Sequence, residues 1–339
     1  MSEAPLFQNL VEHLAVSGRL TGKEVLALRQ QVFPDGVVSR EEALAVFRLD
    51  HACRAKDVDW TRFYVDALTD YYLWQSEPRG TVSPEQARDL IDHIAADGRI
   101  ASTSELELLL NITHYATYCP EDLAILALEA VRESVLKPAR APYGTNRPPS
   151  VIGAGDVEII RKAIYAHGSE GGFTVTRREA DLLWDLKDAT AAEENAPSWG
   201  DLFVKAVGSH LLFPRPAPKQ PELAAVKARE AWLAERRGIG QLLKDMGRAT
   251  RRLDIPLGEA WRALDVFGQE TAAAEAAKEK AWLENAMARE VIDAGEAAWL
   301  IERLERDGEH DVLEAELVAF IEDNARSIDP ALKAYIAGQ

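Results

Sequence analysis

Pairs of carboxylates recur in this sequence on either side of short turns, where they could bind a divalent cation. The partners stand seven or eight residues apart, as Asp35 with Glu42, Asp97 with Glu105, and Asp307 with Glu314. Carboxylate oxygens are ligands that Ca²⁺ and Mg²⁺ take in proteins. The turns differ from an EF-hand, because ligands are missing at the alternate loop positions and no glutamate stands at the twelfth. Cation binding by these six residues is one hypothesis, with a divalent cation as the implied cofactor.

Helix capping explains the same glutamates without a metal. A Ser, Thr or Asp is followed three residues later by Glu or Gln in seven places: Thr21/Glu24, Ser39/Glu42, Ser83/Gln86, Ser102/Glu105, Thr176/Glu179, Asp293/Glu296 and Asp311/Glu314. In this capping box the short side chain accepts a hydrogen bond from the backbone N–H three positions on, and the longer side chain accepts one from the N–H of the cap. Apolar residues that would pack on the first turn precede most caps: Leu20, Val38, Val82, Val175 and Ile292. We favour capping over metal binding, since every helix start has N–H groups to satisfy.

A column of polar residues is the second candidate site. Eight residues after the first apolar residue of four predicted helices stand His51, His114, Asp188 and Asp323, and the position before them carries Asp50, Thr113, Lys187 and Glu322. Polar side chains that interrupt an apolar stripe could line a cleft or coordinate an ion. Alternatively, the stripe has turned to Leu49, Ile112, Leu186 and Ile321, which would leave the column at the surface. The candidates, with no role assigned, are Asp50, His51, His114, Asp188 and Asp323.

The spacing of glycines and caps indicates that these residues lie on repeated elements. A glycine precedes most caps by three or four residues, at Gly18, Gly36, Gly80, Gly98, Gly172 and Gly308. Glycine ends helices because it adopts the left-handed conformation at little cost. Gly18 and Gly80 are 62 residues apart, as are Gly36 and Gly98. The sequence therefore predicts four related units, near residues 17–76, 79–137, 155–213 and 289–338.

Each unit is predicted to contain three helices. The first helix carries apolar residues at i, i+3 and i+7, as Val25, Leu28 and Val32 do in the first unit, and this spacing places them on one helical face. The second helix follows the next cap, and the third begins near Asp59-Trp60, Pro120, Ser198-Trp199 or Asp329-Pro330. Alternating strand patterns with glycine-rich hairpin turns are absent. The predicted fold is all-α, built from tandem helical-hairpin repeats of three helices.

Two proline-rich segments interrupt the helical pattern. Four prolines lie between residues 138 and 156, and four more between 213 and 221; prolines favour extended backbone over helix. We predict an N-terminal helical domain over residues 1–137 with two units and a linker over 138–156. A C-terminal helical domain follows over 157–339, with the third unit, a helical insert at 222–288 and the fourth unit.

Charge and cysteine content limit the partners and the location. The chain has 39 Lys and Arg against 56 Asp and Glu, a formal net charge of −17. Such a charge repels nucleic acid and anionic lipid, which argues against both as partners. Two cysteines cannot form a disulfide framework, and no apolar run reaches the length of a transmembrane helix. The start of the chain lacks the pattern of a signal peptide, so we expect a cytoplasmic location.

One sequence element resembles a known family. The segment DGVVSREE at 35–42 resembles the turn-and-helix element of TerB-like (tellurite-resistance) helical proteins, with looser copies at 17–24, 97–105 and 307–314. The likeness covers the first two units best, the fourth partly and the third poorly, and residues 214–288 lie outside it. The resemblance implies an all-helical cytoplasmic protein associated with stress or metal and metalloid resistance. It also implies divalent-ion binding by Asp35, Glu42, Asp97, Glu105, Asp307 and Glu314.

The sequence favours a protein without enzymatic activity, although it leaves catalysis open. It contains no assembled nucleophile, general base or phosphate-binding loop. The leading hypothesis is a helical-repeat scaffold or regulatory protein that binds a protein partner, or a second copy of itself, through a helical face. The alternatives are a divalent-cation sensor and an enzyme with a cleft between its two halves.

Overall fold

Capping residues mark where the helices of this protein begin. The computed structural model describes residues 4–32, 37–96, 98–143, 148–165, 175–212, 291–306 and 311–338. Its helices are α1 (Ala4–Ser17), α2 (Gly22–Val32), α3 (Arg40–Ala52), α4 (Val58–Thr69), the π-helical turn η1 (Asp70–Trp74), α5 (Pro84–Ile94), α6 (Thr103–Tyr115), α7 (Glu121–Leu136), the 3₁₀ turn η2 (Pro138–Arg140), α8 (Ala154–Ile164), α9 (Arg177–Thr190), α10 (Pro197–Leu212), α14 (Ala294–Leu304), α15 (Val312–Asn324) and α16 (Pro330–Ala337). Four strands of two residues each accompany them: β1 (Arg19–Leu20), β2 (Ala55–Lys56), β3 (Val291–Ile292) and β4 (Ser327–Ile328). The prediction of an all-α protein is confirmed.

Six of the seven predicted capping boxes form both of their hydrogen bonds, and they open α3, α5, α6, α9, α14 and α15. At the seventh, Glu24 accepts from the N–H of Thr21 at 3.1 Å, while Asp57 accepts from the N–H of Gly22 at 2.8 Å. The glycine stops at Gly18, Gly80 and Gly98 have φ angles of 67°, 75° and 80°, the left-handed conformation that glycine adopts most easily. The other predicted stops, Gly36, Gly172 and Gly308, lie outside the described residues.

Short parallel pairings join the start of a first helix to the start of a third helix. Strand β1 pairs with β2 and β3 pairs with β4, both in parallel. A single parallel bridge joins Thr81 to Tyr118 ahead of α5 and α7. Ahead of α8 and α10, the N–H of Ala196 donates to the carbonyl of Ile152 at 2.8 Å. The sequence did not predict these pairings, because two residues are too few to show an alternating pattern.

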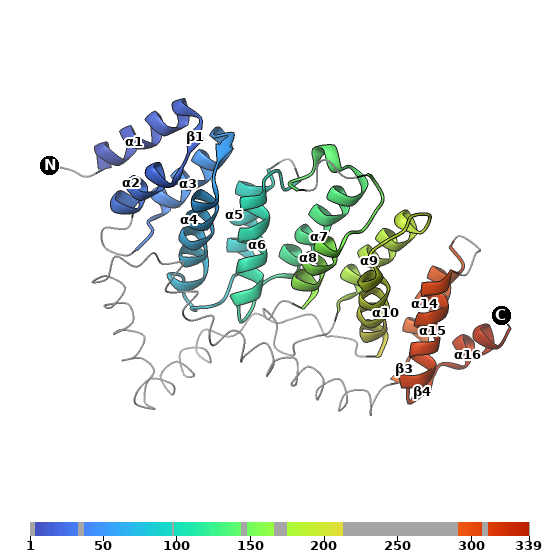
Figure 1. Ribbon diagram of the computed structural model, residues 1–339. Coiled ribbons are helices and arrows are strands. Elements are labelled where there is room, and N and C mark those ends of the chain that lie inside the picture. The colour runs from blue at the N-terminus through green and yellow to red at the C-terminus, as the bar shows by residue number, and fades with distance from the viewer. Residues whose placement is uncertain are drawn as a thin grey trace, which may run out of the picture. The chain divides into compact units, whose positions relative to one another are not determined.

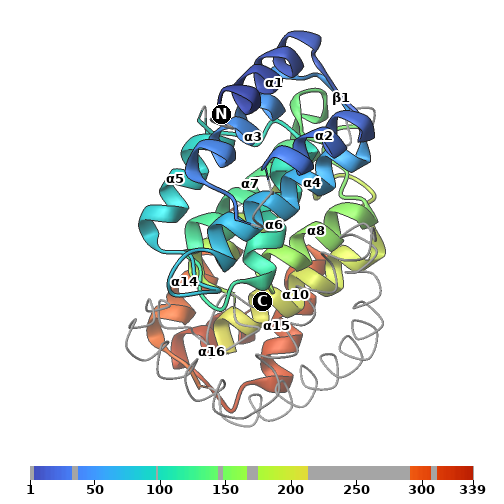
Figure 2. The same ribbon diagram turned by 90° about the vertical axis from the view of Figure 1, so that its left-hand side faces the viewer.

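Third helices pack beside the second helix of the following predicted unit. Figure 1 shows the described helices following one another in chain order, with α4 against α6, α7 against α9 and α10 against α15; Figure 2 shows α4 lying along α6. Two glycines bring α10 and α15 close together. A Cβ added at Gly200 would lie 2.7 Å from Leu313 Cδ2, and one at Gly208 would lie 2.5 Å from the ring of Phe320. Since both contacts advance along both helices, α10 and α15 run parallel.

Contacts between residues divide the chain into two groups, and the predicted domain boundaries stay a prediction. Contacts group Met1–Pro218 with Glu290–Gln339, and Lys219–Arg289 form a separate unit. Helices from both sides of the proline-rich segment at 138–156 belong to the first of these units, where α7 packs against α8 and α9. The insert predicted at 222–288 lies outside the described residues.

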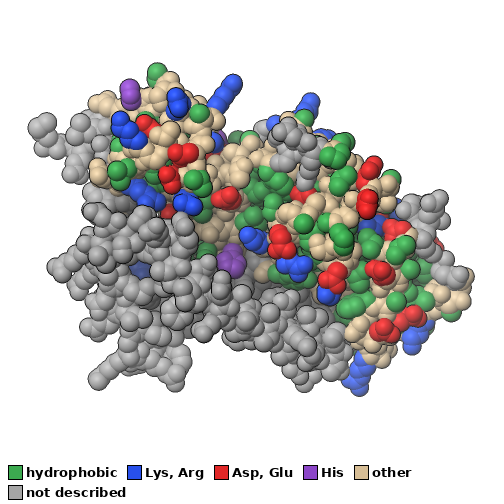
Figure 3. Space-filling model, in the orientation of Figure 1, with side chains coloured by type: hydrophobic (Ala, Val, Ile, Leu, Met, Phe, Trp, Pro, Cys, Tyr) green, Lys and Arg blue, Asp and Glu red, His purple; other side chains and the backbone are tan. Residues whose placement is uncertain are grey.

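Two properties of the described helices bear on partners. Within the described ranges, none of the helices combines the length and apolar character that crossing a bilayer requires. On the face drawn in Figure 3, apolar, acidic and basic side chains are interspersed over the described elements.

Candidate functional site

Part of the polar column is buried where the end of α3 meets the start of α6. Asp50 is 2% exposed. Its carboxylate accepts hydrogen bonds from Trp60 Nε1 at 2.7 Å, Ser104 Oγ at 2.7 Å, Ser102 Oγ at 3.1 Å and Lys56 Nζ at 2.8 Å. Because Ser102 is the N-cap of α6, these bonds fasten one predicted unit to the next. We call the following group the first junction: Asp50, His51, Lys56, Trp60, Ser102, Ser104 and Glu105.

The next residue of the column, His51, contacts the glutamate of the same cap. His51 Nε2 lies 3.0 Å from Glu105 Oε1. The other oxygen of Glu105 accepts from the backbone N–H of Ser102 at 2.8 Å and of Ala101 at 3.0 Å. The hydrogen bond that His51 donates to Glu105 raises the pKa of His51 above its usual value, against the opposing effect of burial. Glu105 therefore caps its own helix and binds the preceding unit.

A second group of buried charges lies where α9 meets the start of α15. Lys187 is 2% exposed, and its Nζ lies 2.8 Å from Asp311 Oδ2 and 3.0 Å from Asp188 Oδ1. The ammonium also donates to Glu314, whose side chain is buried. Burial alone would lower the pKa of Lys187, but the hydrogen bonds to these carboxylates outweigh burial and raise it. We call Lys187, Asp188, Asp311 and Glu314 the second junction.

The two junctions correspond residue by residue when they are counted from the caps. Asp50 is the eleventh residue after the N-cap Ser39, and Lys187 is the eleventh after the N-cap Thr176. Asp50 contacts the capping box of α6, and Lys187 contacts that of α15. Both junctions thus join the end of one second helix to the start of another.

A tryptophan distinguishes the junctions. Trp60 and Trp199 are each the third residue of their helices, α4 and α10, and both are buried. Trp60 donates its indole N–H to Asp50. Among the described residues, the Nε1 of Trp199 has no hydrogen-bond partner. Lys187 occupies the position that corresponds to Asp50. Its ammonium group carries only donors, so it cannot accept a hydrogen bond from Trp199.

The remaining column residues lie in other surroundings. His114 is exposed on α6, with its ring centroid 4.7 Å from that of Tyr115, and Asp323 is exposed near the end of α15. Asp50 and His51 belong to the first junction and Asp188 to the second. The column is therefore neither one cleft nor wholly a surface feature: Asp50 is buried, Asp188 is partly buried, and His51, His114 and Asp323 are exposed.

The described glutamates of the cation hypothesis act as caps. Glu42 accepts from the N–H of Ser39 at 2.7 Å and Glu314 from that of Asp311 at 3.3 Å. Their predicted partners Asp35, Asp97 and Asp307 lie outside the described residues. Across the described ranges, no three His, Cys, Asp or Glu side chains gather as a metal site would require. Cation binding stays a prediction.

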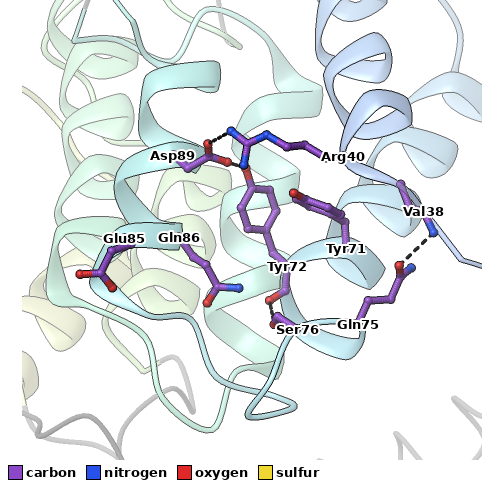
Figure 4. Close-up of a pocket in the computed structure, with 9 residues that line it drawn as sticks. All are labelled: Val38, Arg40, Tyr71, Tyr72, Gln75, Ser76, Glu85, Gln86 and Asp89. Atoms are coloured by element: carbon purple, nitrogen blue, oxygen red, sulfur yellow. Dashed lines mark hydrogen bonds and ion pairs between the residues drawn. The ribbon is translucent and has the colours of Figure 1, made fainter.

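A hollow of about 490 Å³ lies between the start of α3, η1 and α5 (Figure 4). The Tyr72 hydroxyl donates to Asp89 at 2.7 Å, and Arg40 Nη2 lies 3.1 Å from the same carboxylate. The side-chain oxygen of Gln75 accepts from the N–H of Val38 at 2.9 Å. Burial, together with the bond to Asp89, raises the pKa of Tyr72, so its hydroxyl stays a donor. These groups therefore form hydrogen bonds and ion pairs with one another. The hollow is also bordered by the π-helical turn η1, and such turns are frequent at functional sites.

The candidates from the sequence did not include the junction residues Lys56, Ser104 and Lys187 or the neighbouring Trp199, although Lys187 stood beside the polar column. Lys187 carried one usable signal, because a lysine stood next to the buried stripe residue Leu186, and buried lysines need anionic partners. The other three depend on which helices meet, which no spacing within one helix reveals.

No protein-family model, no curated protein and no solved structure matches this chain.

Proposed function

We propose that this chain is a helical-repeat protein without enzymatic activity that binds a protein partner. The proposal rests on one observation: the buried charged side chains at the two junctions bind neighbouring helices to one another. Asp50 accepts four hydrogen bonds, and Lys187 is surrounded by three carboxylates. A catalytic acid, base or nucleophile needs an atom directed at a substrate. These groups instead fix successive helices, as a stacked helical scaffold requires.

The described surface supports protein binding. Apolar side chains are exposed among charged ones (Figure 3), including Val16 at 88% and Val312 at 72%. A mixture of apolar and polar area is typical of interfaces between proteins that also exist apart. A second copy of the chain is the alternative occupant of such a surface.

The resemblance to TerB-like proteins supports a narrower form of the proposal. It places the scaffold in a response to stress or to toxic metals and metalloids. The resemblance depends on the segment DGVVSREE at 35–42 and its looser copies. A cytoplasmic location belongs to the same proposal.

Cross-linking in the cells that make the protein tests this function. Full-length tagged protein would be cross-linked in living cells and purified, and its bound proteins quantified by mass spectrometry against a tag-only control. Light scattering on the purified protein would give its mass in solution. We expect one partner, or a second copy, in fixed stoichiometry. A monomer with no protein enriched over the control would overturn the proposal.

A further inference from the structure

A buried histidine near the end of α10 contacts two other elements of the chain. His210 is 8% exposed. Its Nδ1 lies 3.0 Å from the carbonyl oxygen of Val175, the residue before the N-cap of α9. Its ring centroid lies 5.3 Å from that of Trp299 on α14, at an interplanar angle of 80°. His210 therefore lies where the last three helices, α14 to α16, meet helices that precede them in the chain.

The hydrogen bond to Val175 fixes which nitrogen of the neutral ring carries the hydrogen. A carbonyl oxygen can only accept, so Nδ1 is the donor and Nε2 of the neutral ring is bare. A second proton would have to bind Nε2, on a side chain with little access to water. Burial lowers the pKa of His210, and the hydrogen bond to Val175 opposes this effect. The folded protein thus favours the neutral form of this histidine.

The charged groups around His210 also disfavour a positive charge on its ring. On α9, Arg177 lowers the pKa of His210 and Asp181 raises it by a smaller amount. Within the described ranges, no charged group of α8, α15 or β3, which also pack against α10, acts on His210. On α14, the guanidinium of Arg303 lies 6.0 Å from the ring centroid of Trp299, and that of Arg177 lies 4.5 Å from it. A proton on His210 would add a third positive charge beside this tryptophan.

Asp181 could compensate such a charge, but it already has three partners. Its Oδ1 accepts from Trp299 Nε1 at 2.8 Å and from Arg303 Nη2 at 2.5 Å, and lies 3.5 Å from Arg177 Nε. No other carboxylate among the described residues acts on His210. The surroundings of His210 are therefore arranged for a neutral ring, and a protonated ring would lack a carboxylate of its own.

We propose that His210 is a pH-sensitive contact that holds the last three helices on the stack at neutral pH and loosens them in mild acid. Protonation of Nε2 places a positive charge beside Trp299, where Arg177 and Arg303 repel it. The contact between α10 and α14 is weakened, while the hydrogen bond from Nδ1 to Val175 can remain. The inference goes beyond the proposed function and does not depend on whether the chain binds a protein partner.

The direction of the pH effect follows from the preference for the neutral ring. The pKa of His210 is lower in the folded than in the unfolded chain. The stabilisation is therefore complete above the unfolded value of about 6.5 and is lost as the pH falls through the folded value. Each pH unit between the two values changes the ratio of open to closed molecules by up to about tenfold. We expect α14 to open several-fold more often at pH 5 than at pH 7.5 because of His210.

Hydrogen exchange of the full-length protein tests this contact. Exchange of the backbone amides of α14 would be measured by mass spectrometry at pH 5 and pH 7.5 and corrected for the intrinsic effect of pH on exchange. His210→Gln keeps a donor for Val175 but cannot titrate. We expect acid to increase the opening of α14 several-fold more in wild type than in this variant. The same pH dependence in both proteins would overturn the proposal.

Two further measurements keep the test independent of how well that variant folds. NMR titration of wild type gives the pKa of His210, and a value at or above that of a free histidine would overturn the proposal. Arg177→Gln should raise this pKa and Asp181→Asn should lower it, because each removes one neighbouring charge. His13→Gln replaces an exposed histidine of α1 and should leave the exchange of α14 unchanged. If His13→Gln removes the pH dependence as fully as His210→Gln does, the effect does not arise at this contact.

Discussion

The first and second junctions stand at corresponding places but are built with opposite charges. An acid, Asp50, lies at the centre of the first and accepts from four donors. A cation, the ammonium of Lys187, lies at the centre of the second junction and contacts three carboxylates. The caps differ to match: the Ser102 hydroxyl donates to Asp50, whereas the Asp311 carboxylate accepts from Lys187. Because Ser and Asp both cap helices well, the cap can change with the charge that packs against it.

The opposite charges at the two junctions also decide whether the neighbouring tryptophan has a hydrogen-bond acceptor. They give Trp60 an acceptor and leave Trp199 without one among the described residues. The indole N–H is therefore paired at the first junction and has no partner among the described residues at the second, which borders an open hollow. Two junctions at corresponding positions thus differ in whether the neighbouring tryptophan has a hydrogen-bond acceptor.

Replacing Lys187 at the centre of the second junction should have the largest effect on the stability of the protein. Lys187→Met removes the ammonium that contacts the buried carboxylate of Glu314 and its neighbour Asp311, while Arg306 still lies 3.6 Å from Asp188. Breaking a buried ion pair costs about 3–5 kcal/mol. The measurement is the free energy of unfolding in urea. Lys205→Met is the control, because Lys205 pairs with Asp201 on the surface and should cost less than about 1 kcal/mol. Equal losses would mean that the second junction is not a buried contact.

Replacing the two tryptophans tests the difference between the junctions, with a smaller expected change in stability. Both lose the same volume when replaced by Phe, but only Trp60→Phe removes a hydrogen bond to a buried carboxylate. We expect Trp60→Phe to destabilise the protein by about 1–2 kcal/mol more than Trp199→Phe. Thermal and urea unfolding of the two variants would measure this. If Trp199→Phe costs as much or more, the N–H of Trp199 already has an acceptor and the two junctions do not differ in this respect.

Only the first junction contains a histidine, and it should give a weak pH dependence. Glu105 raises the pKa of His51 in the folded protein. The stabilisation is therefore complete below the unfolded pKa of about 6.5 and is lost as the pH rises through the higher folded value. The side chain is 51% exposed, so we expect only about 0.5 kcal/mol after solvent screening.

The measurement compares wild type with His51→Gln, which keeps a donor but cannot titrate. Urea unfolding between pH 5 and 9 should show wild type losing stability relative to the variant as the pH rises. NMR titration of His51 gives its pKa directly. A value at or below that of a free histidine would contradict the contact with Glu105.

Divalent cations should have the smallest effect of all. At both junctions the cap glutamates already accept backbone N–H groups and contact His51 or Lys187. We expect Ca²⁺, Mn²⁺, Zn²⁺ or EDTA to shift the melting temperature by less than about 1 °C, since only a bound ligand stabilises. A rise that grows with cation concentration would favour the cation-sensor hypothesis instead.

Much of the helical framework could be predicted because it is encoded locally. Capping boxes such as Ser39/Glu42 and stops such as Gly80 act within a few residues of their own position. The junctions could not be predicted, because two of the partners of Asp50, Ser102 and Ser104, lie more than fifty residues away on the next predicted unit. A polar residue in an apolar stripe indicates that it has a partner, but only the packing of helices decides which one.

The close approach of α10 and α15 links two positions that are far apart in the sequence. Because any side chain at residue 208 would collide with the ring of Phe320, neither site can drift freely during evolution. A larger residue at 208 would be tolerated only where 320 had already shrunk. In an alignment of relatives, covariation of this pair would reveal that the last three helices belong to the same stack.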